Sequence, residues 1–374
     1  MAHFPWRSRE ALGDRMGPSV LADARGEATI TSYYAPYHGH DVRHLGIALR
    51  KLREKHDSVV FLAGDSSLDN KFWFDEWSAA RNGYEEVLRP QVMKKDVCYW
   101  MNDPGAEPRR ACLNAAVEAT ALDDRAFGAL LPQDAFLRDH ISGDDILVVS
   151  VGGNDVALAP TACTAAHMGV LTRCTPLWCL GGDSNSETAE RRECASPIRL
   201  PFACVPNLYA APGGGARNCD CGRPCCGLPG CVAGVCGCPC GFGYAVDLFG
   251  NRVQNYVRRL VARTKPKKVL VCTIYYPREK RAARGTEDAA ASWADPALRA
   301  LGYDADPRST RALIRAVHAH ATSRITVPGV PVVPVPLFEV LDPRDARDYV
   351  QRVEPSAAGG RKMARAIAAA IGEF

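Results

Sequence analysis

The chain has 374 residues, of which 47% are hydrophobic and 24% are charged, and its formal net charge is +4. Such a composition is typical of a globular protein with enough apolar residues for a core. The basic residues are scattered and lack interleaved aromatic residues, which argues against nucleic acid as a partner. No apolar run reaches the ~18 residues of a membrane-spanning helix, so no membrane span is predicted.

The N-terminal residues 1–27 predict an irregular leader. Residues 1–25 mix acidic and basic side chains and contain no apolar segment like that of a secretory signal. The sequence therefore favours an intracellular location, cytoplasmic or other, where thiols stay reduced. Against this default, 13 of the 16 cysteines lie between Cys163 and Cys240.

Periodic segments then alternate along the chain. Short apolar and β-branched runs predict buried strands over 58–64, 145–151, 268–276 and 331–338. Apolar residues at helical spacing predict helices over 41–56, 246–263, 308–323 and 356–371. Asp41 and Ser356 are the predicted N-caps of the first and the last helix. Prolines in the last strand favour an edge position.

Strands that alternate with helices predict a parallel sheet covered by helices on both faces, which is an α/β fold. Two segments, 28–160 and 245–374, carry this pattern and are predicted to form one domain. Residues 161–244 are rich in Cys, Gly and Pro, interrupt the pattern, and are predicted to be an insertion. The cysteine spacing over 219–240 leaves three states open: a bound metal, disulfides or free thiols.

Two turns directly follow predicted strands. Gly64-Asp65-Ser66 ends the first strand, and Gly152-Gly153-Asn154-Asp155 ends the second. In parallel sheets ligands bind at the carboxyl ends of the strands, so we expect both turns to face one crevice. A serine at a strand-to-helix turn is exposed for attack on an acyl carbon, and nearby N–H groups stabilise the oxyanion. Ser66 is therefore the candidate nucleophile, and the Asn154 amide is a candidate oxyanion donor.

The two turns resemble sequence blocks of the SGNH (GDSL-type) hydrolase family. FLAGDSSLDN (61–70) is similar to block I, VVSVGGNDVAL (148–158) to block III, and EPSAAGGRKMARAI, from residue 354, to the last block. The resemblance implies a flavodoxin-like three-layer α/β/α sandwich with a parallel sheet. It implies an esterase-like or acyl-transferring enzyme that forms an acyl-enzyme on Ser66. The implied substrate is a small-molecule ester or acylated compound, and no cofactor is required.

The same resemblance implies an oxyanion hole made by the Ser66 N–H, Asn154 and a block II glycine, with Gly64, Asp65 and Gly153 at the pocket. Two positions depart from the family pattern. The segment similar to block II, CLNAAVEAT (112–120), has Ala119 in place of the glycine, although any residue but proline offers an N–H. The last block normally reads Asp-x-x-His-Pro, and here Gln351 and Glu354 replace the Asp and the His.

Glu354 is thus the candidate for an atypical base. A free Glu, with a pKa near 4.3, is a poor base, but burial raises the pKa. We expect the neighbouring Arg352 to lower it instead. A purely structural role near the N-terminus of the last helix is the alternative.

The histidines offer other bases. His167 follows the second turn and lies on the expected side of the sheet, whereas His140, His318 and His320 are expected near the opposite end. His38, His40 and His44 have a spacing that suggests a metal site or an exposed helix start. Among the remaining polar residues, Asp65 and Asp155 are expected to stabilise their own turns, and Asp69 and Asn70 to lie near the crevice.

Three functions follow from these observations. The leading one is an SGNH-type ester hydrolase with Ser66, Asn154 and Glu354 in its site. A second is a catalytically impaired relative that binds an acyl or glycan ligand, for which Trp73, Trp77 and Trp100 are candidate lining residues if they do not simply pack in the core. A third is a metal-binding module formed by the cysteine-rich insertion.

Overall fold

The computed structural model describes residues 26–35, 38–103, 110–181, 239–280 and 292–372. Its centre is a five-stranded sheet with the order β6-β2-β7-β8-β9, and every neighbouring pair is parallel. The strands are β6 (Arg110–Asn114), β2 (Ser58–Gly64), β7 (Ile146–Ser150), β8 (Lys268–Thr273) and β9 (Val332–Pro336). The predicted parallel α/β fold is confirmed, and the proline-containing strand β9 lies at an edge.

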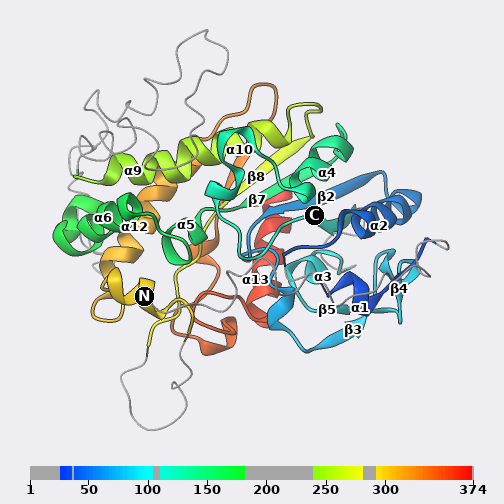
Figure 1. Ribbon diagram of the computed structural model, residues 1–374, viewed down its shortest axis with the longest axis horizontal. Helices are drawn as coiled ribbons and strands as arrows, with labels where there is room; N and C mark the ends of the chain where they lie inside the picture. Colours follow the sequence, from blue (N-terminus) through cyan, green and yellow to red (C-terminus); the bar gives the residue numbers. More distant parts are fainter. Residues whose placement is uncertain (1–25, 36–37, 104–109, 182–238, 281–291, 373–374) are drawn as a thin grey trace.

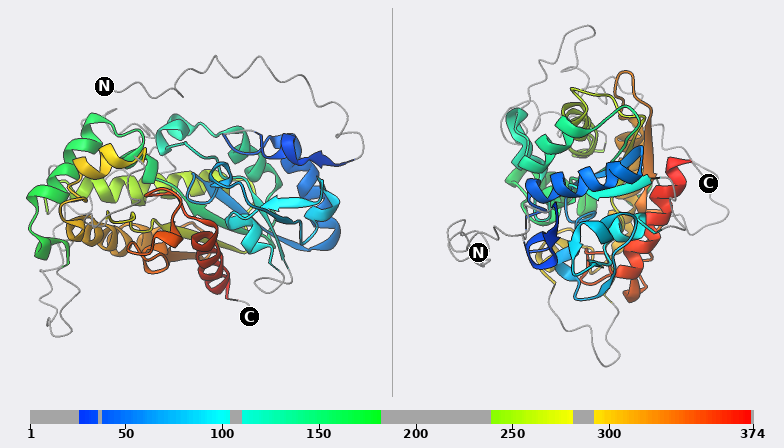
Figure 2. Two further views of the ribbon diagram at one scale, coloured as in Figure 1. Left: turned by 90° about the horizontal axis from the view of Figure 1, so that it is seen from below. Right: turned by 90° about the vertical axis from the view of Figure 1, so that its right-hand side faces the viewer.

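Helices cover both faces of this sheet (Figures 1 and 2). One face carries α2 (Val42–Lys55), α4 (Pro132–His140) and α10 (Val253–Leu260), and the other carries α13 (Ala357–Ile371). The predicted caps are present: Asp41 accepts the N–H of Arg43 at 2.8 Å, and Ser356 accepts that of Gly359 at 3.1 Å. The result is the three-layer α/β/α sandwich that the family resemblance implies.

The predicted helix over 246–263 is divided in the structure. It consists of α9 (Phe242–Val246), a π-helical segment η8 (Asp247–Arg252) and α10. Helix α12 (Pro307–His320) matches its prediction closely and packs against β8 and α9. Such π-helical turns are often found beside functional sites, and η8 contributes Phe249 to the pocket described below.

The start of the predicted insertion 161–244 is helical. Helix α6 (Ala162–Gly169) and the π-helical segment η5 (Val170–Cys174) pack against α9 and α12. The cysteine-rich residues up to 238 lie outside the described residues, as does the predicted leader up to residue 25. The remaining cysteines outside the predicted insertion, Cys98, Cys112 and Cys272, are buried free thiols.

Small elements complete the described chain. Two two-stranded sheets pair β1 (Ala28–Thr29) with β4 (Leu88–Arg89), and β3 (Trp77–Ala79) with β5 (Val92–Lys94). The short helices are α1 (Ile30–Tyr33), α3 (Val97–Met101), α5 (Gly153–Ala157) and α11 (Asp295–Ala300), and 3-10 turns include η2 (Lys71–Trp73) and η4 (Leu122–Gly128).

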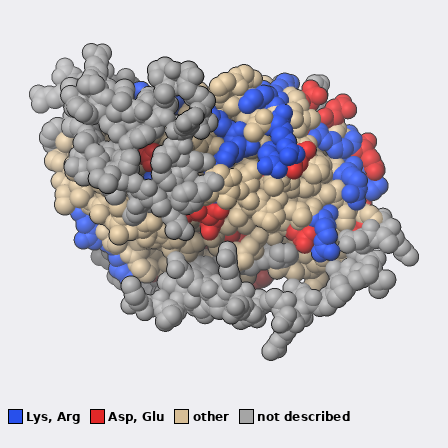
Figure 3. All heavy atoms as spheres, turned by 45° about the horizontal axis from the view of Figure 1, so that its top comes forward, with Lys and Arg blue, Asp and Glu red and all other residues tan. Residues whose placement is uncertain are grey.

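Surface properties agree with the modest net charge. On the face shown in Figure 3, Lys and Arg side chains lie in groups with Asp and Glu side chains between them. None of the described helices combines the length and the hydropathy needed to cross a membrane.

Candidate active site

Ser66 lies in a tight turn directly after β2. The N–H groups of Leu68 and Asp69 both donate to the Asp65 carbonyl at 3.1 Å, and these bonds close the turn. The next element is the three-residue η2, so the helix expected after Ser66 is absent from this continuously described stretch. The backbone N–H groups beside Ser66 therefore belong to a turn and not to the N-terminus of a helix.

The Ser66 hydroxyl donates to Glu354 Oε1 at 3.3 Å, across 288 positions of sequence. Glu354 immediately precedes Pro355 and Ser356, the N-cap of α13, and only 2% of it is exposed. The geometry thus brings together the two residues that sequence reasoning selected as nucleophile and base. Gln351, at the position of the family's usual Asp, is not among the described residues that line the pocket around this pair, and its buried Oε1 has no hydrogen-bond partner among them.

The pKa of Glu354 is raised well above its usual range. Burial is the main cause and the nearby Asp65 carboxyl is the next, while the bond from Ser66 opposes them. Trp293 also approaches the carboxyl closely enough to lower the pKa slightly, but its indole N–H does not reach hydrogen-bond geometry. Glu354 is therefore protonated over a wider pH range than an ordinary carboxyl, and only its ionised form accepts a proton.

Arg352 does not influence this carboxyl as the sequence suggested. Its guanidinium turns away and pairs with Asp295 at 3.0 Å and Asp304 at 2.7 Å. The expectation that Arg352 lowers the pKa of Glu354 was wrong, because two acidic residues from the α11 region bind the cation elsewhere.

Gly64 and Asp65 form the end of β2. Gly64 has φ +129°, and a Cβ there would lie 1.8 Å from the Ser150 carbonyl oxygen on β7, so only glycine fits. Asp65 is buried and accepts the N–H of Ser67 at 3.0 Å and its hydroxyl at 2.7 Å. This confirms the prediction that Asp65 stabilises its own turn, whereas Asp155 instead accepts the N–H of Leu122 at 2.9 Å.

Asn154 lies in α5, just past the end of β7, and lines the same pocket as Ser66. Its Nδ2 donates to the Thr120 carbonyl at 2.9 Å, which uses one of its two hydrogens. Gly152, with φ +108°, precedes α5, and Gly153 packs against Ile274. Two strand-end turns therefore do meet at one crevice.

Ala119 adopts a left-handed backbone conformation, with φ +57°. Such a conformation is ordinary for the glycine of the family pattern and unfavourable for alanine. Ala119 is not among the described residues that line the pocket, but it lies between Glu118 and Thr120, and Thr120 holds Asn154.

A pocket that opens to solvent lies beside Ser66. Its volume is about 950 Å³, which includes the open space at its mouth. Ser66, Asn154 and Glu354 lie at its polar side. Apolar side chains from α5, α6, η8 and α12, from the segment after β8 and from α11 and the residue after it form most of the rest: Val156, Ala157, Met168, Phe249, Ile274, Leu298, Leu301, Leu313, Ile314 and Val317. Trp293 also lines the pocket, while none of Trp73, Trp77 and Trp100 does.

No histidine is among the described lining residues of this pocket. His167 stacks on Tyr244, with ring centroids 4.9 Å apart, and His140 binds the Phe136 carbonyl through Nδ1 at 2.7 Å. His318 lies nearer than expected, because its Nδ1 is 2.8 Å from the Thr273 hydroxyl at the carboxyl end of β8.

The N-terminal histidines contact neighbouring residues. His40 Nδ1 is 2.8 Å from the Tyr33 carbonyl, and His44 Nε2 is 2.9 Å from the Ser32 hydroxyl. Among the described residues, no group of three His, Cys, Asp or Glu side chains is arranged to hold a metal ion.

Comparison with known proteins gives few matches. No protein-family profile matches the chain, and no curated protein sequence does. Two solved structures are similar to it: an extracellular lipase from Streptomyces rimosus (13% identity, TM-score 0.35) and phospholipase A1 from Streptomyces albidoflavus NA297 (11% identity, TM-score 0.32). Each match covers 84% of this chain and 99% of the other. Similarity at this level does not establish an activity or a substrate for this chain.

Proposed function

We propose that the protein is an SGNH-type serine hydrolase that cleaves or transfers the acyl group of a small-molecule ester. The observation that carries the proposal is the 3.3 Å hydrogen bond from Ser66 to Glu354 at the polar side of a largely apolar pocket. A nucleophile in contact with a buried carboxyl is one of the arrangements that support acyl transfer. The apolar walls suit the hydrocarbon part of an acyl chain.

In this mechanism, ionised Glu354 takes the proton of Ser66 as its oxygen attacks the ester carbonyl. The oxyanion is stabilised by the Ser66 N–H and by the hydrogen of Asn154 Nδ2 that Thr120 does not use. Glu354 then gives the proton to the departing alkoxide, which leaves an acyl group on Ser66. Water, or a second alcohol, then attacks the acyl carbon and gives its proton to Glu354. Glu354 returns this proton to the departing Ser66 oxygen as the bond to the acyl group breaks, which restores the free hydroxyl and the ionised carboxyl.

One observation favours a second candidate function, ligand binding without turnover. The pKa of Glu354 is raised mainly by burial, so the protonated form persists to higher pH than in an ordinary carboxyl, and a protonated carboxyl is not a base. Its Oε2 is buried without a hydrogen-bond partner. A protein with this pocket and a permanently neutral Glu354 would bind an acylated ligand and not cleave it.

A fluorophosphonate probe tests the first function, with wild type, Ser66→Ala and Glu354→Gln compared from pH 5 to pH 10. Ser58→Ala is a matched control, because Ser58 lies at the opposite end of β2 and donates to the Asp144 carbonyl. We expect labelling of wild type and the control, none of Ser66→Ala, and greatly slowed labelling of Glu354→Gln. Absence of labelling and of p-nitrophenyl ester hydrolysis at every pH would leave the binding function as the better one.

The third function, a metal-binding module, stays a proposal, since most of the cysteine-rich segment lies outside the described residues. Elemental analysis of the purified protein tests it directly.

A further inference from the structure

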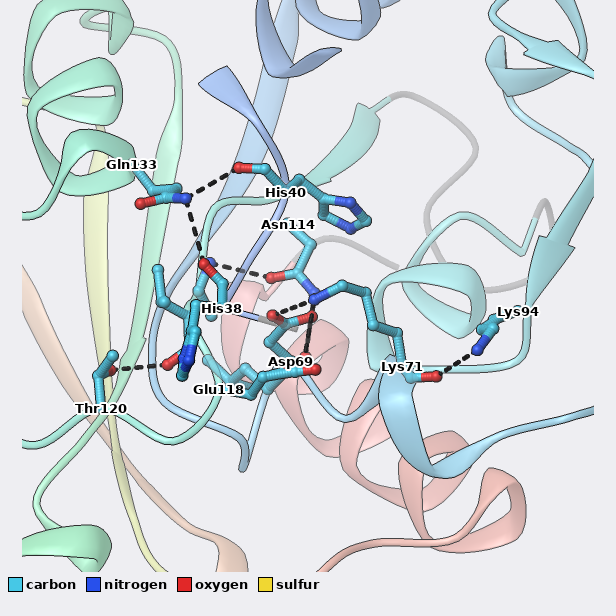
Figure 4. Close-up of polar contacts among 12 residues, drawn as sticks. His38, His40, Asp69, Lys71, Lys94, Asn114, Glu118, Thr120 and Gln133 are labelled. Atoms are coloured by element: carbon cyan, nitrogen blue, oxygen red, sulfur yellow. Dashed lines mark hydrogen bonds and ion pairs between the residues drawn. The ribbon is translucent and has the colours of Figure 1, made fainter. Parts of the chain in front are cut away.

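A buried ammonium group lies beside the turn that carries Ser66. Lys71 is 1% exposed, and its Nζ lies 2.6 Å from Asp69 Oδ2 and 3.3 Å from Glu118 Oε2 (Figure 4). A buried charge is costly unless it is well paired, so these contacts determine where Lys71 lies. Because Asp69 belongs to the Ser66 turn and Glu118 directly precedes Ala119, one ammonium joins two separate segments.

Asp69 is fixed to the Ser66 turn by its backbone and side chain. Its N–H donates to the Asp65 carbonyl at 3.1 Å, and its Oδ1 accepts Asn114 Nδ2 at 3.2 Å. The Asn114 amide also donates to the Leu68 carbonyl at 3.3 Å. A displacement of Asp69 therefore displaces the turn on which Ser66 lies.

The segment around Ala119 is held at both of its ends. On one side Lys71 binds Glu118; on the other Arg125 Nη1 donates to the Thr120 hydroxyl at 3.0 Å, and Asn154 donates to the Thr120 carbonyl. The left-handed conformation of Ala119 costs ~1–2 kcal/mol for a residue with a Cβ, and it persists only where the surroundings impose it. Glu118 and Thr120 provide that constraint.

We propose that Lys71 is a positioning residue for the oxyanion site, where its buried ammonium fixes the Ala119 segment, and through Thr120 the Asn154 amide, relative to Ser66. This inference rests on the proposed hydrolase function. Lys71 touches no substrate; it sets the separation between the nucleophile and the groups that stabilise the oxyanion.

The protonation states keep this link intact at neutral pH. Burial opposes the charge on Lys71, but Asp69 and Glu118 outweigh it and raise the lysine pKa. Burial, followed by the charge of Asp69, raises the pKa of Glu118 to about 9. Lys71 is thus charged at neutral pH, and Glu118 accepts its hydrogen bond.

Glu118→Leu removes the acceptor on the Ala119 side and leaves the ion pair between Lys71 and Asp69 in place. Because Glu118 Oε1 already lacks a partner, an apolar side chain of similar size is expected to leave the protein folded. Displacement of an oxyanion donor weakens only the transition state, so we expect kcat for p-nitrophenyl esters to fall ~10- to 100-fold with little change in KM. Lys71→Met is expected to lower kcat by at least as much.

The double variant Lys71→Met/Glu118→Leu tests whether the two residues act through one link. If they do, its kcat equals that of Lys71→Met and does not fall by the product of the two single effects. Lys95→Met is the matched control, because Lys95 Nζ pairs with Glu76 Oε2 at 3.1 Å, outside the link. Its kcat is expected to stay within ~2-fold of wild type.

Amide hydrogen exchange of residues 115–121 gives a readout that needs no activity. We expect faster exchange in Glu118→Leu and not in Lys95→Met. If wild type neither hydrolyses esters nor is labelled on Ser66, the hydrolase function fails while the exchange data still test the link. The positioning role itself is overturned if Glu118→Leu keeps wild-type kcat and exchange, or if the two substitutions lower kcat independently.

Discussion

Asn70 Nδ2 donates to the Pro355 carbonyl at 2.7 Å and so joins the segment after the nucleophile to the residue after Glu354. Both Asn70 and Pro355 are buried, and the side-chain oxygen Oδ1 of Asn70 has no hydrogen-bond partner among the described residues. A single amide therefore links the two loops that carry Ser66 and Glu354, which approach each other from opposite ends of the described chain.

Asn70→Ala should weaken both stability and activity. It leaves the Pro355 carbonyl without its donor, and loss of a buried hydrogen bond costs ~1–3 kcal/mol. We expect urea unfolding to show a loss in this range, and ester hydrolysis to fall because the 3.3 Å contact between Ser66 and Glu354 loosens. Full activity with reduced stability would show that the two loops keep their geometry without this bond.

The activity should rise with pH. The proposed base is ionised Glu354, and its pKa lies well above its usual range because of burial and the Asp65 charge. Below that pKa the ionised fraction, and with it kcat/KM, grows ~10-fold per pH unit. Measurements of kcat/KM from pH 5 to pH 10, with Ser66→Ala as the blank, check this. A flat profile over this interval would mean that another group is the base.

The free energy of unfolding should fall as pH rises, because of the same residue, Glu354. A raised pKa means that folded Glu354 keeps its proton where the unfolded chain releases it, so the free energy of unfolding falls as pH rises above ~4.3. The limiting slope is ~1.4 kcal/mol per pH unit. In Glu354→Gln this loss is absent, so the variant should gain stability relative to wild type between pH 5 and pH 8.

Urea unfolding of wild type and of Glu354→Gln at pH 5 and at pH 8 tests this prediction. Asp96 and Asp155, whose pKa values burial raises to about 7, titrate in both proteins and cancel in the difference. A difference between the variant and wild type that does not change with pH would contradict the raised pKa.

The fold was largely predictable because most of its strands are marked by a local pattern in the sequence. Four of the five sheet strands are short apolar runs. Three of them, β2, β7 and β8, are buried on both faces, which leaves a continuous hydrophobic pattern. Strand β6 was missed, since Arg110–Asn114 contains Arg and Asn and is buried only through contacts with β2, α2 and α3. The formation of β6 as a strand therefore depends on its pairing with β2, which is distant in the sequence.

The candidate site was predictable only in part. Ser66 and Asn154 were selected from the two strand-end turns and Glu354 through the family resemblance, and the structure places all three on one pocket. Lys71 and Trp293 were missed: a lysine ordinarily predicts an exposed position, and its burial here depends on Glu118, 47 residues away. After Ser66 the chain forms a turn and the three-residue η2 in place of a longer helix, and the side chains of Asp69 and Asn70 bind distant partners, Asn114 and Pro355.

Two glycines of the site should respond differently to alanine. At Gly64 a Cβ would meet the Ser150 backbone oxygen at 1.8 Å, with φ +129°, so Gly64→Ala must push β2 from β7. At Gly153 the nearest atom, at 2.4 Å, is the flexible end of Ile274. We expect Gly64→Ala to lose more than ~2 kcal/mol of stability and all activity. Gly153→Ala should fold and favour shorter acyl chains, as thermal unfolding and an ester series would show.

Ala119 provides the most direct test of the left-handed segment. Glycine at φ +57° removes the ~1–2 kcal/mol strain of a Cβ but adds freedom to the unfolded chain, so Ala119→Gly should change stability by less than ~1 kcal/mol and keep activity. Ala119→Val adds a β-branched side chain that this conformation disfavours, and it should lower both stability and kcat. Unfolding curves and ester kinetics of the pair check this. If Ala119→Val kept wild-type kcat, the left-handed segment would have no part in stabilising the oxyanion.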